Sequence, residues 1–303
     1  MDASPLFPPR HTVAEEAREA LLHVIRRAPE HFGYQRSRWT LALLRQACDW
    51  LQLATSAGMS QLLRRLGISY KRARAYVHSP DPHYDQKLSL LELARLGAYY
   101  QPDRYVFLYL DELSYYRQTS LASAYAATGP EQPLALRSYR SNTHFRVVAA
   151  LNAISGQVTY RQAYKINLRQ LSAFYADLRA DYPDAEVIYV AQDNWPVHFH
   201  PDVLARLQPQ HWPYPYNCPP SWPQQPSARA VHDDLPIQLL CLPTYASWCN
   251  PIEKLWRWLK QDRLHLHRMS DDWQALKQDV ANFLDGFKHG SPDLLRYVGL
   301  LPN

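Results

Sequence analysis

The sequence predicts an α/β core with a mixed sheet, preceded by an all-helical region, and three observations support this. Up to about residue 80, apolar residues recur at helical spacing. After Pro102, short runs rich in Tyr, Val, Phe and Leu alternate with helical segments, which is typical of an α/β fold. The first 80 residues contain 12 Lys and Arg but only 6 Asp and Glu, whereas the rest of the chain is close to neutral. A basic module joined to a near-neutral body indicates that the protein binds a polyanion.

Two helices are expected at the start of the chain. Residues 12–29 have apolar positions at helical spacing, and Pro29 ends that pattern. Residues 37–54 show the same spacing, and Ser37 can cap a helix there.

A helix-turn-helix is expected next. Ser60 can cap a short helix that ends near Leu66, Gly67 begins a tight turn, and residues 70–78 can form a second helix. Helix, Gly-containing turn and helix is the sequence pattern of a DNA-binding helix-turn-helix or a winged-helix-like region.

The expected elements of the α/β core follow a linking helix at 83–99. They are a strand at 104–112, a hairpin at 144–166 that turns at Ser155 and Gly156, a helix at 168–183, strands at 185–194 and 236–243, and helices starting near residues 250, 270 and 291.

The chain is therefore divided into a helix-turn-helix region at 1–80, a linker at 81–102 and an α/β domain at 103–303. Residues 208–236 do not fit a compact core, because they hold eight of the 24 prolines and two tryptophans. We interpret this segment as an insertion with little regular structure.

Other protein classes are disfavoured by composition. The longest apolar runs are short, so no membrane span is predicted. The N-terminus lacks a secretory pattern, and we expect the protein to be cytoplasmic. Its four cysteines contain no C-x-x-C pair, so reduced thiols are favoured over a zinc site.

Three carboxylates stand near the ends of predicted elements. Asp111 ends the first strand, Asp193 ends another, and Glu253 lies in the first turn of a helix that follows a third. Side chains at such places can converge in the crevice of an α/β sheet, where grouped carboxylates need a cation such as Mg²⁺ or Mn²⁺. Loops are polar in any protein, however, so position alone leaves open that these acids are only strand and helix termini.

Neighbouring polar residues have their own alternatives. Glu112 is expected to point away from Asp111, since adjacent strand residues face opposite sides. Asn194 is a candidate to orient Asp193 or a metal-bound water, or to form a turn with it. His198 and His200 are expected at the surface or on DNA phosphates rather than on a metal.

The residues before Glu253 look like a helix start. Asn250 can cap a helix, and Pro251 suits its first position. On that helix, Trp256 is expected to pack in the core. Three basic residues are either DNA contacts or a solvated face: Lys254, Arg257 and Lys260.

Five motifs together carry a resemblance to a known family. They are "FGYQRSRWT" (32–40), "LLRRLGISYKRAR" (62–74), "LDE" (110–112), "AQDNWPVH" (191–198) and "LPTYASWCNPIEKLWRWLK" (242–260). The chain closely resembles the DDE transposases of bacterial insertion sequences, in the mariner-related IS630 family. It departs from the usual third motif at Ala246, Ser247 and Cys249, and its step from Asp193 to Glu253 is longer than usual because of residues 208–236.

The resemblance implies an RNase H-like catalytic domain with Asp111, Asp193 and Glu253 as its catalytic triad. These residues would hold two ions of Mg²⁺ or Mn²⁺. Asn194 and Asn250 are candidates to support the three carboxylates without binding the metal themselves. The partners implied are double-stranded DNA, namely transposon ends and target DNA, and a second subunit that pairs two ends. Cut-and-paste movement into TA targets is expected.

Eight N-terminal residues are candidates for DNA contact, because Arg and Lys bind phosphates and a recognition helix reads bases. They are Arg36, Arg38, Arg64, Arg65, Tyr70, Lys71, Arg72 and Arg74. An ordinary basic surface is the alternative.

Two other functions stay open. One is a DNA-binding repressor or a domesticated, inactive relative of a transposase. The other is an RNase H-like nuclease that cuts without joining strands.

Overall fold

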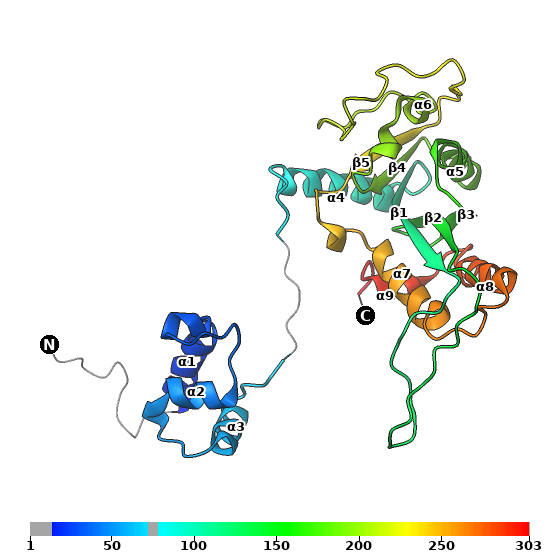
Figure 1. Ribbon diagram of the computed structural model, residues 1–303. Coiled ribbons are helices and arrows are strands. Elements are labelled where there is room, and N and C mark those ends of the chain that lie inside the picture. The colour runs from blue at the N-terminus through cyan, green and yellow to red at the C-terminus, as the bar shows by residue number, and fades with distance from the viewer. Residues whose placement is uncertain (1–13, 72–77, 303) are drawn as a thin grey trace. The chain divides into compact units, whose positions relative to one another are not determined.

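The computed structural model describes residues 14–71 and 78–302, and the chain divides into two compact units, one up to residue 76 and one from residue 77 (Figure 1). The described helices of the first unit are α1 (Ala14–Ile25), α2 (Leu41–Ala47) and α3 (Ser56–Arg65), with short 3-10 turns at Pro29–Phe32 and Asp49–Leu51. A small core made of Leu21, Val24, Leu44, Cys48 and Met59 holds them together.

Helix boundaries in this unit differ from the sequence prediction. The helix expected at 37–54 is the shorter α2, because Thr40 caps it by accepting a hydrogen bond from the Leu43 N–H. The predicted cap at Ser60 is also wrong, since Thr55 caps α3 through the Gly58 N–H. The turn at Gly67 is confirmed by its φ of 68°. The second helix predicted at 70–78 lies largely outside the described residues, and the helix-turn-helix stays a prediction.

The second unit is an α/β structure. Its elements are α4 (Tyr84–Tyr100), β1 (Tyr105–Tyr116), β2 (His144–Asn152), β3 (Val158–Ala163), α5 (Leu168–Asp181), β4 (Val187–Gln192), α6 (Pro201–Leu204), β5 (Ile237–Cys241), α7 (Ile252–Leu259), α8 (Trp273–Asp285) and α9 (Pro292–Val298). None of the helices in the described part of the chain is long and apolar enough to cross a bilayer.

The sheet has the strand order β3-β2-β1-β4-β5. Strands β1, β2 and β3 pair antiparallel, whereas β4 and β5 continue parallel to β1. This confirms the predicted mixed sheet and the hairpin, which turns where Gly156 has a φ of 72°.

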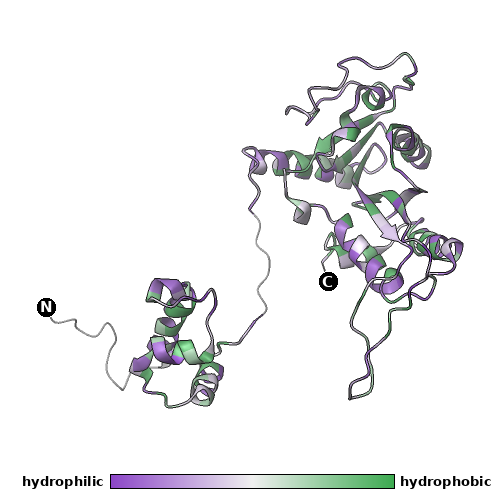
Figure 2. Cartoon of the chain, in the orientation of Figure 1, coloured by the Kyte–Doolittle hydropathy of each residue, from purple (hydrophilic) through white to green (hydrophobic). Residues whose placement is uncertain are grey.

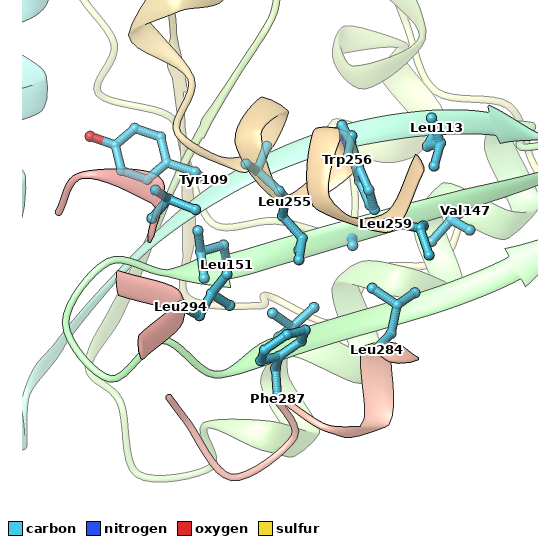
Figure 3. Close-up of a cluster of buried hydrophobic side chains, with 14 of the residues drawn as sticks. Tyr109, Leu113, Val147, Leu151, Leu255, Trp256, Leu259, Leu284, Phe287 and Leu294 are labelled. Atoms are coloured by element: carbon cyan, nitrogen blue, oxygen red, sulfur yellow. The ribbon is translucent and has the colours of Figure 1, made fainter. Parts of the chain in front are cut away.

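Alternation along the strands builds a separate core on each face of the sheet. Odd-numbered residues of β1, such as Tyr109 and Leu113, join a cluster with α4, α7, α8 and α9, in which Leu255, Trp256 and Leu259 are buried (Figure 3). Even-numbered residues face a second cluster with α5. The apolar residues of the strands and of the helix faces toward them stand out in Figure 2.

Two long connections have no helix or strand in their middle. Residues 117–143 leave the sheet after β1 and return to β2 as an extended excursion (Figure 1). Residues 208–236, the predicted insertion, run from α6 to β5 and likewise contain no named helix or strand.

Candidate active site

Asp111 lies inside β1 rather than at its end. The parallel pairing of β1 with β4 stops at Tyr109 and Ala191, but its antiparallel pairing with β2 continues through Asp111 and Ala149 to residue 116. The predicted strand end is therefore wrong. Asp111 nevertheless stands two residues past the last pair between β1 and β4, and its side chain lines a cavity beside the end of β4.

Trp256 contacts the Asp111 carboxylate from the hydrophobic core. Its indole Nε1–H donates a hydrogen bond of 2.9 Å to Asp111 Oδ2, and the ring itself is only 1% exposed. The expectation that Trp256 packs in the core is correct, but this second contact is new. Because the two residues are 145 positions apart, only the fold reveals it.

The pKa of Asp111 is raised from 3.8 to about 8. Burial is the main cause, and the negative charges of Glu253 and Glu112 add to it. Hydrogen bonds from the Glu112 N–H and from Trp256 act in the opposite direction. Ionising Asp111 at neutral pH thus needs a positive charge nearby.

Asp193 follows the last residue of β4 and has an open position. Its side chain is 56% exposed, and Oδ1 accepts a hydrogen bond of 2.9 Å from the Trp195 N–H. The next residue, Asn194, is bonded to a neighbouring loop, and its role in orienting Asp193 or a metal-bound water stays a prediction. Its Nδ2–H donates to the Leu242 carbonyl at 2.8 Å, which ties the loop after β4 to the loop after β5.

Glu253 is the second residue of α7 and is exposed, as expected for an acid in a first helical turn. Asn250 does not cap this helix with its side chain. Instead, Asn250 Nδ2–H donates to the Leu110 carbonyl on β1 at 3.2 Å, and the residue is 5% exposed. This bond fixes the start of α7 beside Asp111.

A single cavity of about 390 Å³ is lined by all three predicted carboxylates, Asp111, Asp193 and Glu253. The predicted supporting residues Asn194 and Asn250 also line it. Among the described residues, no three His, Cys, Asp or Glu side chains stand close enough to form a ready metal site. The carboxylate oxygens that line the cavity nonetheless suit Mg²⁺ or Mn²⁺. A bound cation would also favour the ionised form of Asp111, which burial disfavours.

His198 is fully buried, so its predicted surface position is wrong. Its Nε2 lies 3.4 Å from Glu112 Oε1 and 3.8 Å from Asp193 Oδ1, while Nδ1 lies 3.3 Å from the Tyr175 hydroxyl. Glu112 points away from Asp111 as predicted, toward this histidine. His198 therefore lies between the carboxylates of Glu112 and Asp193. His200, by contrast, caps α6 by accepting from the Asp202 N–H.

The insertion at 208–236 contributes to the same site. Tyr216 stacks on Phe199 at 4.4 Å with nearly parallel rings, and the Cys218 thiol contacts the Phe199 carbonyl. Between them, Asn217 lines the cavity and donates from Nδ2 to the Asn194 carbonyl at 3.3 Å. The insertion is irregular, as predicted, but it is anchored to the core, which composition did not indicate.

The DNA-contact candidates belong to the first unit. Arg64 and Arg65 form the exposed last turn of α3, and Tyr70 is 90% exposed. Arg36, Arg38 and Lys71 are exposed as well, whereas Arg72 and Arg74 lie outside the described residues.

Three basic residues on α7 or directly after it line a second hollow of about 670 Å³: Lys254, Arg257 and Lys260. Lys254 also donates from Nζ to the Val298 carbonyl, at the end of α9, at 2.7 Å. The hollow shares Ser247, Asn250 and Glu253 with the carboxylate cavity. A basic surface therefore adjoins the acidic site.

The chain is similar to known proteins in both sequence and fold. Residues 106–277 match the family model described as DDE superfamily endonuclease. The chain is 24% identical over 278 residues to the insertion element IS630 uncharacterized 39 kDa protein of Shigella sonnei, covering 89% of this chain and 72% of the relative.

Solved structures of the Mos1 transposase have a similar fold. The paired-end complex with the left transposon end superposes with a TM-score of 0.59 at 17% identity, covering 100% of this chain and 79% of that one. The Mos1 strand transfer complex gives a TM-score of 0.58 at 16% identity, covering 78% of its chain. These similarities confirm the predicted RNase H-like fold of the catalytic part.

Proposed function

Because the chain belongs to the DDE superfamily of endonucleases, we propose that it is the transposase of an insertion element related to IS630 and mariner. It binds the ends of its element, cuts DNA there and joins the freed ends to a target. One observation carries this proposal above the others: Asp111, Asp193 and Glu253 reach one cavity from three separate elements.

The carboxylates would hold divalent cations, Mg²⁺ or Mn²⁺, and two ions suit the reaction. When bound, such a pair supplies an activated water and stabilises the departing 3′ oxygen. The Mos1 complexes with Mn and with Mg are in keeping with this choice for a related fold. Among the residues of this chain, Trp256 holds Asp111, and Asn250 holds the start of the helix that presents Glu253.

The chemistry consists of two displacements at phosphorus. In the first, water attacks the phosphodiester at the element end, and a 3′-hydroxyl leaves. In the second, that 3′-hydroxyl attacks a phosphodiester of the target and displaces another 3′ oxygen. We propose TA dinucleotides as targets. No bond between protein and DNA is needed, because water and the freed 3′-hydroxyl are the nucleophiles of the two displacements.

The basic first unit would bind the terminal repeats. Arg36, Arg38, Arg64, Arg65 and Lys71 are exposed for phosphate contact, and Tyr70 for contact in a groove. We propose a homodimer on DNA, because two ends must be cut and joined together, and a site of action in the bacterial cytoplasm.

The direct test is Asp193→Asn in the full chain, with a duplex carrying the inverted repeats that flank its coding sequence. Mg²⁺-dependent cleavage should be lost while binding to the duplex is kept. Asp184→Asn, which replaces an exposed aspartate outside the cavity, should cleave normally. Undiminished cleavage by the Asp193→Asn protein would refute the assignment, and cleavage without joined products would identify a nuclease instead.

A further inference from the structure

Tyr245 lies in the loop between β5 and α7 and lines the carboxylate cavity. Its side chain is 76% exposed. Its backbone has a φ of 54°, in the left-handed region that residues with a Cβ rarely adopt. Strained residues of this kind persist where the surrounding structure enforces them, and they cluster at functional sites.

The preceding residue, Thr244, is held at both of its backbone polar groups. Its N–H donates to Asp81 Oδ2 at 2.9 Å, and its carbonyl accepts from Ser79 Oγ at 2.6 Å. Asp81 in turn pairs with Lys87 Nζ at 2.8 Å, and the two side chains are 3% and 10% exposed. We call Ser79, Asp81 and Lys87 the latch.

The loop is also closed from its other side. The Ala246 N–H donates to the Pro243 carbonyl at 3.2 Å, so a tight turn brackets Tyr245. A buried ion pair is costly unless its members are fully bonded. Here Asp81 accepts from Lys87, from Thr244 and from the His83 N–H. The latch therefore holds one loop conformation, in which the Tyr245 ring faces outward.

The chemistry of the cavity indicates what this ring meets. Cations held by the carboxylates would act on the scissile phosphate, so the nucleobase beside that phosphate needs a contact of its own. Bases stack on aromatic side chains without regard to sequence, because every base has a π-face. An exposed ring at the rim of an acidic cavity suits that contact.

We propose that Tyr245 is a substrate-binding residue on which a nucleobase next to the scissile phosphate stacks, and that the latch positions it. This inference rests on the proposed function. It adds a residue that touches DNA from the catalytic unit, and a positioning role for Asp81 at the beginning of the linker to the first unit.

The stacking is tested with Y245F and Y245A in the full chain. The probe is the flanking terminal-repeat duplex with 2-aminopurine beside the cut site, bound to protein that also carries Asp193→Asn so that the DNA stays intact. Y245F should quench the fluorophore as the unsubstituted residue does, and Y245A should not. In chains that retain Asp193, Y245A should cleave roughly 5- to 150-fold more slowly, the loss expected for one base stack.

Normal cleavage and normal quenching by Y245A would overturn the inference. Y245G guards against misfolding, since glycine accepts the left-handed backbone, and it should behave as Y245A does. If the unsubstituted protein does not cleave at all, the proposed function fails, whereas the fluorescence comparison still reports on stacking.

The latch is tested by hydrogen exchange at the Thr244 amide, which does not depend on activity. D81N and the milder S79A should both speed that exchange and weaken the quenching by Tyr245. D85N, an exposed aspartate in the first turn of α4, is the matched control and should change neither. Unchanged exchange at Thr244 in both latch variants would remove the positioning role.

Discussion

Asp111 and Asp193 bring the same chemical group into one cavity from opposite surroundings. Asp111 is held inside a strand, and a buried indole bonds its carboxylate. Asp193 stands on a loop with 56% of its side chain exposed, next to an insertion that reaches the cavity through Asn217. On the sheet side, ionising the buried Asp111 costs free energy. On the loop side, the exposed Asp193 and the insertion beside it can change without disturbing the core.

The largest expected effect concerns the stability of the metal-free protein. The pKa of Asp111 is about 8 in the folded protein against 3.8 when unperturbed. Between these values the folded state holds a proton that the unfolded chain has lost, so the free energy of unfolding falls as pH rises from about 4 to about 8. Asp111→Asn removes this loss and should stabilise the protein at pH 8 by several kcal/mol, on the order of 2–5.

Thermal unfolding in EDTA checks this prediction. The two proteins should unfold alike near pH 4 and diverge toward pH 8. Asp193→Asn is the comparison, and because its side chain is exposed it should change stability by less than about 0.5 kcal/mol at either pH. Equal pH profiles for the Asp111→Asn and unsubstituted proteins would show that the ionisation of Asp111 does not lower the free energy of unfolding.

A smaller effect is expected for the indole that supports Asp111. Trp256→Phe keeps an aromatic ring in the core but removes a donor to the ionised carboxylate, so the pKa of Asp111 should rise further. The cost is about 1–3 kcal/mol where Asp111 is ionised. Cleavage should then require a higher pH. The measurement is the rate of cleavage as a function of pH, in which the midpoint of the rise on the acid side should move to higher pH.

Trp258→Phe is the matched control for that substitution. Trp258 also donates from Nε1 to a carboxylate, that of Asp262, but this bond is exposed and lies away from the cavity. Its loss should leave the acid limb of cleavage where it is. An equal shift in both variants would mean that the Asp111 contact has no special role.

The same contrast explains what the sequence could predict. Strands and helices of the core follow from local periodicity, and Asp193 and Glu253 stand where the end of a strand and the start of a helix were expected. The length of β1 depends on its partner β2, so Asp111 was assigned to an end that does not exist. The resemblance to a family, rather than spacing, selected the three acids among many polar termini.

Contacts between distant segments were beyond prediction. His198 looked like a surface residue, because its burial depends on Tyr175 and Glu112 from other elements. The latch joins residues more than 160 positions apart, since Asp81 meets Thr244. No periodicity or composition encodes such pairs, and they are what holds the loops of the site in place.

The smallest expected effect lies on the loop side. Asn217 is exposed, and its hydrogen bond to the Asn194 carbonyl is a neutral one, so Asn217→Ala should change the free energy of unfolding by less than about 0.5 kcal/mol. Loss of one such hydrogen bond near DNA is worth about 0.5–1.5 kcal/mol, which corresponds to a decrease in cleavage of about two- to tenfold. Ser221→Ala, four positions away in the exposed part of the insertion, is the control. A decrease confined to Asn217→Ala would show that the insertion, which lines the cavity through Asn217, takes part in cleavage. No decrease would mean that the insertion is anchored beside the cavity without taking part in cleavage.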